Sequence, residues 1–511
     1  MNNAKKLSRE EIAYIEIGNT QVTSIQKWGL TIFFLLFIGT YPILQMFYRQ
    51  PFAEWRREKT LQKSIKAYET AIEDNSLLRK WLLPPAQRLL TETLHTGNEK
   101  VIIGHDGWLF FSGDYEYLIN PGFLRPEKLH KRLLSEVQPD PVKAITDFQR
   151  QLAERNIRLI LLPVPVKPMI YPDKLGGAAT PLQNASWPEF KHQIEAAGVT
   201  VIDLVPDFSA MRKLGIAPYL KTDTHWTPEG MLRAAKLTAS VAGGTTLRQE
   251  NSDAVSHSVM SHTATGDTAA MLNLPESKEF FPAETVQLTE YNFVPDRNAE
   301  ILLLGDSFTN IYSLPAMNWG SKAGFAETLA AQLQQPLDVI ARNDAGAYAT
   351  RQLLANELKR GRDRLAGKKV VIWEFAIREL ANGDWKILDM TLENVPESQL
   401  LEITEPRTVT ATVLAVTPVP RPNSAPYKDH VMSILIGDID GGNNTALVYV
   451  PSMRNNVWTK AASLRPGDVV SLDLFPFEQY EATYGSWNRS EFDDESLLLA
   501  TPAWGSFNHD K

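Results

Sequence analysis

The chain has 511 residues, of which 43% are hydrophobic and 22% charged, as in a globular protein with room for more than one domain. A formal net charge of −8 and the lack of a basic stripe with interleaved aromatics argue against nucleic acid as a partner. The absence of cysteine excludes disulfides and thiolate chemistry but does not decide the compartment.

An uncharged run from Trp28 to Tyr48 is long enough to cross a bilayer as a helix. Aromatic residues flank the run, as interfacial anchors do, and no small-residue cleavage pattern closes it. The alternative is a buried globular helix. Basic residues are more numerous after the run than before it, but long domains can translocate despite such a count. We therefore expect residues 1–48 to form a cytoplasmic tail and a retained transmembrane anchor.

The stretch after the anchor is predicted to be helical and then to change to alternating strands and helices. Residues 49–100 carry apolar residues at helical spacing among many charges, which predicts a helical stalk. The alternation that follows predicts a mostly parallel sheet covered on both faces. We expect strands at 108–111, 157–165, 199–204, 299–306, 337–341 and 369–375, helices at 141–155, 187–197, 228–242, 324–334 and 348–360, and a polar loop region at 245–285 that covers the site.

A carboxylate and an imidazole, Asp223 and His225, lie one residue apart just before a predicted helix. The sequence Thr227–Glu229 reads as an N-cap, a proline at the first helical position and an acid in the first turn. In an extended segment, residues two apart point to the same side, so Asp223 can fix the tautomer of His225. The same pair can also be two ligands of a metal, although no third ligand at a useful spacing is obvious.

A second motif, Gly305-Asp306-Ser307, ends the apolar run 301–304. A short apolar run that stops at a turn is typical of a buried parallel strand. A hydroxyl at that point lies at the carboxyl end of the sheet, where ligands bind in open α/β folds. Backbone N–H groups of the following turn can hold a developing oxyanion. The motif is weak alone, but together with Asp223 and His225 it predicts a nucleophile with its base and orienting acid.

From about residue 400 the pattern changes to period-two alternation, which is typical of β-strands. The alternating segments are 408–414, 431–436, 446–450 and 469–474, with a turn signal at 465–468. We expect an all-β module over residues 399–511, either a small barrel or a sandwich. Aromatic residues on such a module more often form core than a sugar-stacking surface, and here they are Tyr449, Trp458, Phe475, Phe477, Tyr480, Tyr484 and Trp487.

Five blocks of the sequence, in this order, resemble the alginate O-acetyltransferase family, the AlgJ/AlgX-type proteins of exopolysaccharide acetylation. They are Asp-Gly-Trp-Leu-Phe at 106–110, Pro-Val-Lys with a following Tyr-Pro at 165–172, Asp-Thr-His-Trp at 223–226, Gly-Asp-Ser-Phe at 305–308, and Trp-Glu-Phe with an arginine at 373–378. The resemblance covers about residues 100 to 390. It implies a three-layer α/β, SGNH-hydrolase-like catalytic domain in the periplasm, which we place at residues 101–398.

The resemblance also implies roles for three residues: Ser307 as nucleophile, His225 as base and Asp223 as the acid that orients the base. In ordinary SGNH hydrolases the serine block comes first and the histidine block last. Here the histidine block precedes the serine, an order typical of the alginate-type proteins.

Three further residues are candidates for the oxyanion hole or for substrate binding. The loop after strand 337–341 looks like the SGNH glycine block, so the N–H of Gly346 and the side chain of Asn343 are candidate donors. The usual SGNH asparagine is not evident, and Glu374 and Arg378 occupy its neighbourhood. Arg378 is the third candidate, and the alternative for it is an ion pair that holds a loop.

These observations predict an O-acetyltransferase in the inner membrane, single-pass, with its bulk in the periplasm and a polysaccharide as substrate. Ser307 takes the acyl group and a sugar hydroxyl resolves the acyl-enzyme, with His225 moving the proton, so neither a metal nor an organic cofactor is needed. The resemblance implies a membrane-embedded acyltransferase as the partner that supplies the acyl group. Two alternatives stay open: a polysaccharide O-acetyl esterase of the SGNH class, and a non-catalytic polysaccharide-binding or assembly protein.

Overall fold

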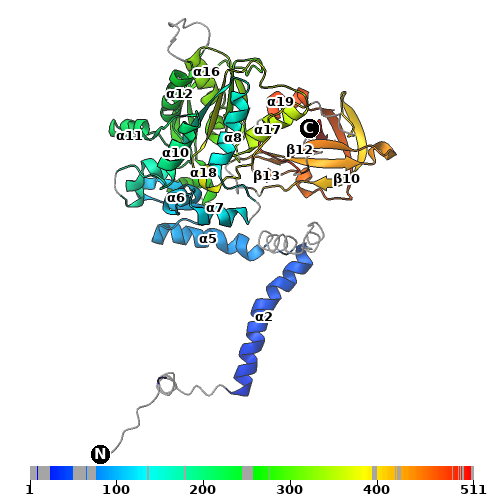
Figure 1. Ribbon diagram of the computed structural model, residues 1–511. Coiled ribbons are helices and arrows are strands. Elements are labelled where there is room, and N and C mark those ends of the chain that lie inside the picture. Colours follow the sequence, from blue (N-terminus) through cyan, green and yellow to red (C-terminus); the bar gives the residue numbers. More distant parts are fainter. Residues whose placement is uncertain are drawn as a thin grey trace, which may run out of the picture. The chain divides into compact units, whose positions relative to one another are not determined.

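The computed structural model divides into two compact units, Met1–Leu89 and Leu90–Lys511 (Figure 1). It describes residues 9, 23–49, 65, 76–134, 137–177, 180–243, 257–274, 277–343, 345–393, 400–420, 422, 427–485, 487–492, 494, 497 and 500–507.

The first unit contains helix α2 (Ser24–Arg49), and helix α5 (Leu77–Leu94) begins there. Helix α2 covers the stretch in which the sequence predicts an anchor. Among the residues that the structure describes, no helix combines the length and the apolar character needed to cross a membrane. The anchor therefore stays a prediction. Two parts of the predicted stalk, 50–64 and 66–75, lie outside the described residues.

The second unit contains a five-stranded parallel sheet with the strand order β4-β3-β9-β7-β8. The strands β3, β7 and β9 are buried along almost their whole length. Strands of a parallel sheet read as continuous apolar runs because helices cover both faces. The strands are β3 (Arg158–Val164), β4 (Thr200–Val201), β7 (Ile301–Gly305), β8 (Asp338–Ala341) and β9 (Val370–Ala376). The predicted α/β fold with a parallel sheet is thus confirmed.

Helices surround this sheet, as Figure 1 shows. Helix α8 packs against α10, and α12 packs against α16. Their bounds are α6 (Ser112–Ile119), α7 (Pro126–Leu133), α8 (Pro141–Ala153), α9 (Lys167–Ile170), α10 (Trp187–Ala196), α11 (Val205–Lys213), α12 (Pro228–Ala242), α15 (Ser307–Asn310), α16 (Phe325–Leu333), α17 (Ala349–Lys359) and α18 (Glu379–Asn382). A short antiparallel pair, β1 (Val101–Ile103) and β2 (Leu109–Phe111), precedes them.

The strand order determines where the chain presents its functional groups. Strand β7 lies between β9 and β8, with Leu304 opposite Trp373 on one side and Ile340 on the other. Ser307 follows β7 directly and begins α15. It therefore lies at the carboxyl edge of the sheet, between the ends of β9 and β8, where open α/β folds bind ligands.

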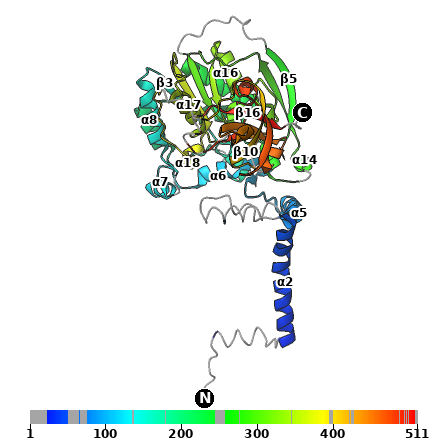
Figure 2. The same ribbon diagram turned by 90° about the vertical axis from the view of Figure 1, so that its right-hand side faces the viewer.

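The expectation of a loop region at 245–285 is wrong for much of its length. Residues 245–256 and 275–276 lie outside the described residues. The described part contains an antiparallel pair of strands, β5 (His257–Ala264) and β6 (Glu284–Tyr291), with α13 (Asp267–Met271) and α14 (Ser277–Phe280) between them. Figure 2 shows β5 on the opposite side of the unit from α8. The sequence shows no clear strand periodicity here because few side chains of these two strands face the core. Val286 and Leu288 do, whereas Val259 is 65% exposed.

The C-terminal strands form a separate, β-barrel-like region, as the sequence predicts. Strand β12 pairs with β16 and also with β11, so the sheet β12-β16-β14-β10-β11 closes on itself. It has its own apolar core, separate from that of the α/β region. The bounds are β10 (Arg407–Val416), β11 (His430–Gly437), β12 (Ala446–Arg454), β13 (Val457–Trp458), β14 (Val469–Pro476), α19 (Glu478–Tyr484), β15 (Arg489–Ser490) and β16 (Ala503–Phe507). The domain limits drawn from the sequence stay predictions.

Candidate functional site

The structure brings Asp223, His225 and Ser307 into one hydrogen-bonded line. Nδ1 of His225 lies 2.7 Å from Oδ1 of Asp223, and Nε2 lies 2.8 Å from Oγ of Ser307. The three residues are at most 3% exposed. In this arrangement Nδ1 donates to the carboxylate and Nε2 faces the hydroxyl as a proton acceptor. An imidazole so held can act as a general base towards a serine.

The turn that carries Ser307 is fixed by the residue before it. Asp306 is the N-cap of α15, where its Oδ1 accepts the N–H of Phe308 at 2.8 Å. Its Oδ2 accepts the N–H of Ala376, at the end of β9, at 2.7 Å. A Cβ on Gly305 would overlap the side chain of Thr309, so only glycine fits between strand and helix there. The turn that carries Ser307 is therefore tied to strand β9 as well as to its own strand.

A buried acid of the neighbouring strand β9, Glu374, also binds this turn. Its Oε2 accepts the N–H of Asp306 at 3.0 Å and the hydroxyl of Thr309 at 2.7 Å. Burial, with the charge of Asp306 added, raises the pKa of Glu374 well above its ordinary value. Glu374 therefore keeps its proton to higher pH than an exposed glutamate does.

Asp223 is held as an anion. Oδ2 of Asp223 accepts the backbone N–H of Asp267 at 2.9 Å and Nε1–H of Trp319 at 2.8 Å. Burial opposes ionisation of Asp223, but its hydrogen bond to His225, the charge of His225 and these donors bring its pKa down to about 2. Burial likewise opposes charging of His225, but the hydrogen bond and charge of Asp223, with Asp267 and Asp306, raise its pKa.

A buried lysine, Lys167, holds the segment that leads to His225. Its Nζ donates to the backbone carbonyls of residues 220, 221 and 223 at 2.6 to 3.1 Å. The rings of Trp108 and Phe110 lie 5.9 and 5.4 Å from the ammonium. Burial lowers the pKa of Lys167 to about 8. The sequence blocks at 106–110 and 165–172 thus contribute residues that hold the segment before His225.

Of the three oxyanion candidates, Gly346 lies against the nucleophile turn. A Cβ at this position would come 3.3 Å from Oδ2 of Asp306 and 3.3 Å from Cβ of Phe375. The carbonyl oxygen of Gly346 accepts Nε1–H of Trp373 at 3.2 Å. Close packing on both sides explains the glycine, and its role as an oxyanion donor stays a prediction.

The other two candidates are occupied by other partners. Oδ1 of Asn343 accepts Nδ2–H of Asn310 at 2.7 Å. Arg378 forms an ion pair with Asp114 at 2.9 Å, and its guanidinium lies over the ring of Phe111. This ion pair is the alternative that the sequence left open for Arg378. An oxyanion or substrate role for either residue stays a prediction.

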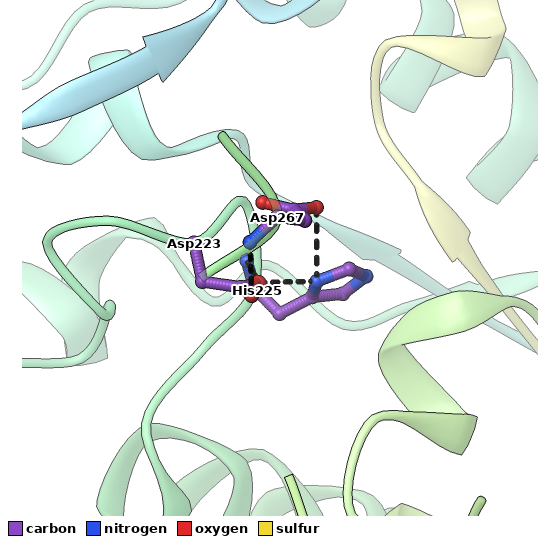
Figure 3. Close-up of side chains that lie close together, drawn as sticks. All are labelled: Asp223, His225 and Asp267. Carbon is purple, nitrogen blue, oxygen red and sulfur yellow. Dashed lines mark hydrogen bonds and ion pairs between the residues drawn. The ribbon is translucent and has the colours of Figure 1, made fainter. Parts of the chain in front are cut away.

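Sequence reasoning missed Asp267, which reaches the site from α13. Figure 3 shows its carboxylate and that of Asp223 both near the ring of His225. Oδ2 of Asp267 lies 3.7 Å from Nδ1 of His225. Burial and the charge of Asp223 raise the pKa of Asp267 to about 6. The only local signal is an acid that follows Gly266 in a polar stretch, which the sequence alone cannot connect to a histidine more than forty residues away.

Asp223, His225 and Asp267 are also a group that could hold a metal ion, since their ligand atoms lie within 4.8 Å of one another. A metal on Nδ1 of His225 would displace its hydrogen bond to Asp223 and leave the proton of the neutral ring on Nε2. Nε2 could then not accept the proton of Ser307. Metal binding by this group and a base role for His225 therefore exclude each other.

The aromatic residues of the barrel region mostly pack together. Trp504 stacks on Tyr484, with ring centroids 4.2 Å apart, and on Tyr480 at 5.6 Å. By contrast, Trp458 is 48% exposed. The other partly buried or buried members of this cluster are Tyr449, Phe475, Phe477 and Trp487. This packing favours the structural role of these aromatics over a sugar-stacking surface.

Known proteins resemble this chain over the α/β region. A family model described as "SGNH hydrolase-like domain, acetyltransferase AlgX" matches residues 101–377, more than half of the chain. The "Probable alginate O-acetylase AlgJ" of Pseudomonas aeruginosa is 30% identical over 137 residues, which cover 27% of this chain and 31% of that protein. The protein of the same name from Pseudomonas fluorescens is 24% identical over 328 residues, 62% of this chain and 77% of that one.

The matched lengths differ among these relatives. The match spans 31% of the Pseudomonas aeruginosa protein and 51% of the protein of the same name from Pseudomonas syringae, at 25% identity. Among solved structures, the O-acetyltransferase domain of Pseudomonas putida AlgJ is 21% identical, with a TM-score of 0.42 over 55% of this chain and 92% of that chain.

Proposed function

This chain belongs to the family of SGNH hydrolase-like, AlgX-type acetyltransferase domains, and we propose from this that it is an O-acetyltransferase that modifies a polysaccharide. The observation that carries the proposal is the hydrogen-bonded line from Asp223 through His225 to Ser307 at the carboxyl edge of the sheet. The names of the relatives support acetyl as the group transferred and an alginate-like exopolysaccharide as the acceptor.

The proposed reaction has two half-reactions with one proton carrier. Oγ of Ser307 attacks the carbonyl carbon of an acetyl donor while Nε2 of His225 takes the hydroxyl proton. The bond from the acetyl group to the donor breaks, and the leaving group takes that proton from His225. A sugar hydroxyl then gives its proton to Nε2 and attacks the acetyl-serine ester. The new sugar ester leaves, and Ser307 regains its proton from His225.

The neighbouring acids explain how His225 carries the proton. When Nε2 accepts it, the ring becomes a cation that faces the anionic Asp223, whose carboxylate stays ionised because its pKa is about 2. The ion pair forms in a buried site, where charge interactions are stronger than in water.

We also propose that the chain is anchored in the inner membrane with the α/β and barrel regions in the periplasm, and that a membrane-embedded acyltransferase supplies the acetyl group. The uncharged run from Trp28 to Tyr48 supports the anchor. A reporter that works only in the cytoplasm, fused after Lys511, should be silent, whereas an active reporter would contradict this orientation.

The test of the proposed function uses a small acetyl ester as donor and unacetylated alginate as acceptor. The parent protein should place acetyl groups on the polymer, and Ser307→Ala should place none while keeping its fold. Ser240→Ala, which changes an exposed serine in α12, is the matched control and should behave as the parent does.

Two results of this experiment would contradict the proposal and select an alternative. Release of acetate with no acetyl on the polymer would show the O-acetyl esterase, since the same triad serves water as well as a sugar. A folded parent protein that binds the polymer but never cleaves the ester would show the non-catalytic binding or assembly protein.

A further inference from the structure

The segment that carries the base has no regular secondary structure, yet side chains from elsewhere pair its backbone groups. The ammonium of Lys167 donates hydrogen bonds to three carbonyl groups of this segment. The carboxylate of Glu284 accepts the N–H groups of Lys221 at 2.9 Å and Thr222 at 2.8 Å. Buried backbone polar groups need such partners. The position of His225 is therefore set by residues that lie far from it in the sequence.

Most of these partners come from one insert, residues 257–291, which the strands β5 and β6 and the helices α13 and α14 form. Glu284 begins β6. The carbonyl of Thr222 accepts the hydroxyl of Thr268 at 2.5 Å and the N–H of Ala269 at 3.2 Å. A Cβ on Gly266 would overlap the carbonyl of Thr222, so the two backbones are in contact. The insert thus closes directly onto the segment that carries the base.

Asp267 is the member of this insert that reaches the triad itself. Its Oδ1 accepts the N–H of Thr224 at 2.7 Å, and its Oδ2 accepts the hydroxyl of Thr224 at 2.7 Å. Its own N–H donates to Oδ2 of Asp223. Thr224 is the residue between Asp223 and His225, so Asp267 binds both the middle of the Asp-x-His turn and the orienting acid.

We propose that Asp267 is a positioning residue of the triad, which fixes the turn at Thr224 and places a second carboxylate beside Nδ1 of His225. The inference rests on the proposed function, because it assigns Asp267 a role in the reaction that His225 serves. The distance of 3.7 Å from Oδ2 to Nδ1 is too long for a hydrogen bond but short for a charge interaction in a buried site. Protonated His225 therefore faces two carboxylates (Figure 3).

Other charged groups surround this pair. Asp306 before α15 and Asp114 in α6 interact with the charge of His225. Lys167 in α9 interacts with Asp267, Asp223 and Glu284 of β6. In the described part of the chain, the carboxylates that pair with Nδ1 of His225 are those of Asp223 and Asp267. The charge of Asp267 favours the protonated imidazole, so its removal should let His225 lose its proton at lower pH.

Asp267→Asn separates charge from geometry. The amide can still accept the N–H of Thr224 through its oxygen and can donate to the hydroxyl of Thr224 through its nitrogen. With a small acetyl ester, the acid limb of the kcat/KM profile should move to lower pH by about one unit, and kcat on the plateau should stay within about threefold of the parent value. A profile that overlays that of the parent would overturn the inference.

Two further variants complete the experiment: one is a control, and the other tests the inference if Asp267→Asn does not fold. Asp207→Asn removes the same charge from α11, where Asp207 forms an ion pair with Arg233 of α12, and should leave the acid limb in place. Asp267→Glu keeps the charge but misplaces it by one methylene, so it should lower kcat by about tenfold or more without moving the limb. If Asp267→Asn does not fold, a parent-like kcat for Asp267→Glu would overturn the inference.

The same assay distinguishes this inference from the proposed function. If Ser307→Ala turns over the ester as the parent does, the proposed function fails whatever Asp267 does. If turnover depends on Ser307 while Asp267→Asn keeps the parental profile and rate, the inference alone fails.

Discussion

At the scale of single residues, the orienting acid is the most fully bonded group of the site. Both oxygens of Asp223 accept two hydrogen bonds, from the N–H and ring of His225 and from Asp267 and Trp319. An amide in its place must either face its nitrogen towards two donors or offer it to Nδ1 of His225. The first arrangement sets the amide nitrogen against the donors of Asp267 and Trp319 and is therefore disfavoured. In the second, Nδ1 becomes an acceptor and Nε2 carries the ring proton, so Nε2 cannot act as a base.

Asp223→Asn should therefore lower kcat by on the order of 10³ to 10⁴, even with the fold intact. Turnover of a small acetyl ester measures the loss, with His225→Ala as the reference for a missing base. A variant within about tenfold of the parent would show that Asp223 does not orient His225.

The raised pKa of Glu374 predicts a pH dependence of stability. The folded state keeps the proton of Glu374 at pH values where the unfolded chain, with an ordinary value of 4.5, has lost it. Because the folded state then binds more protons than the unfolded state, the free energy of unfolding falls as pH rises above that value, until the pH passes the folded pKa.

Glu374→Gln should remove this dependence, since a glutamine matches the neutral acid in shape and keeps an acceptor for Asp306 and Thr309. The melting temperature of the variant relative to the parent should be higher at about pH 8 than at about pH 5. Thermal unfolding at the two pH values checks this, and a variant that loses as much stability at both would show that the acid is ionised in the fold.

The residues that sequence could identify are those whose signal is local. The spacing of Asp223 and His225 and the place of Ser307 after an apolar run are visible in a single stretch of chain. Asp267 and Trp319 reach Asp223 across 44 and 96 residues. Such contacts depend on how an insert folds back, and no periodicity encodes them.

At the scale of elements, the predicted start of the helix after the base is confirmed. Helix α12 begins at Pro228, and Oγ1 of its N-cap Thr227 accepts the N–H of Gly230 at 3.1 Å. The same hydroxyl donates to the carbonyl of Ala217 at 2.6 Å. This cap fixes the chain two residues after His225.

Thr227→Ala should lower the free energy of unfolding by about 1 kcal/mol, since it removes the acceptor for the N–H of Gly230 and the donor to the carbonyl of Ala217. Urea unfolding measures the loss, and Thr227→Ser, which keeps the hydroxyl, should recover most of it. An alanine variant as stable as the parent would mean that the cap contributes nothing here.

The strands that the sequence predicts well are the buried ones. Strands β3, β7 and β9 are covered on both faces, so their sequences are apolar runs that stand out. The expected strand 199–204 shrinks to Thr200–Val201, because it lies at the edge of the sheet and pairs on one side alone. The strands of the insert have one exposed face and polar residues on both, which hides their period.

At the scale of the whole second unit, polar contacts join the α/β region to the barrel region. Arg342 donates to the carbonyl of Arg489 at 2.9 Å, and Arg360 donates to the carbonyl of Ala500 at 2.8 Å. Residues of both regions also line a cavity of about 670 Å³. Interfaces between domains of one chain are more polar than obligate subunit interfaces. Polar contacts between two regions with their own apolar cores therefore fit two domains.

A chain that ends at Ser398 should therefore fold and turn over a small acetyl ester, since Asp223, His225 and Ser307 all precede that point. It should acetylate alginate less well, because remote binding that positions the acceptor favours transfer over hydrolysis. Unchanged polymer acetylation by the truncated chain would assign the barrel region another role, and insoluble protein would show that the boundary is wrong.

If Ser307 carries the acetyl group between donor and sugar, as we propose, an acyl-enzyme on Ser307 must form during the reaction. Brief reaction with a small acetyl ester, acid quenching and mass spectrometry of the intact protein and its peptides should find one added acetyl group, on the peptide that contains Ser307. The acetyl group should disappear on incubation with alginate and should never form in Ser307→Ala. An acetyl group on another residue, or transfer to polymer by Ser307→Ala, would contradict the account.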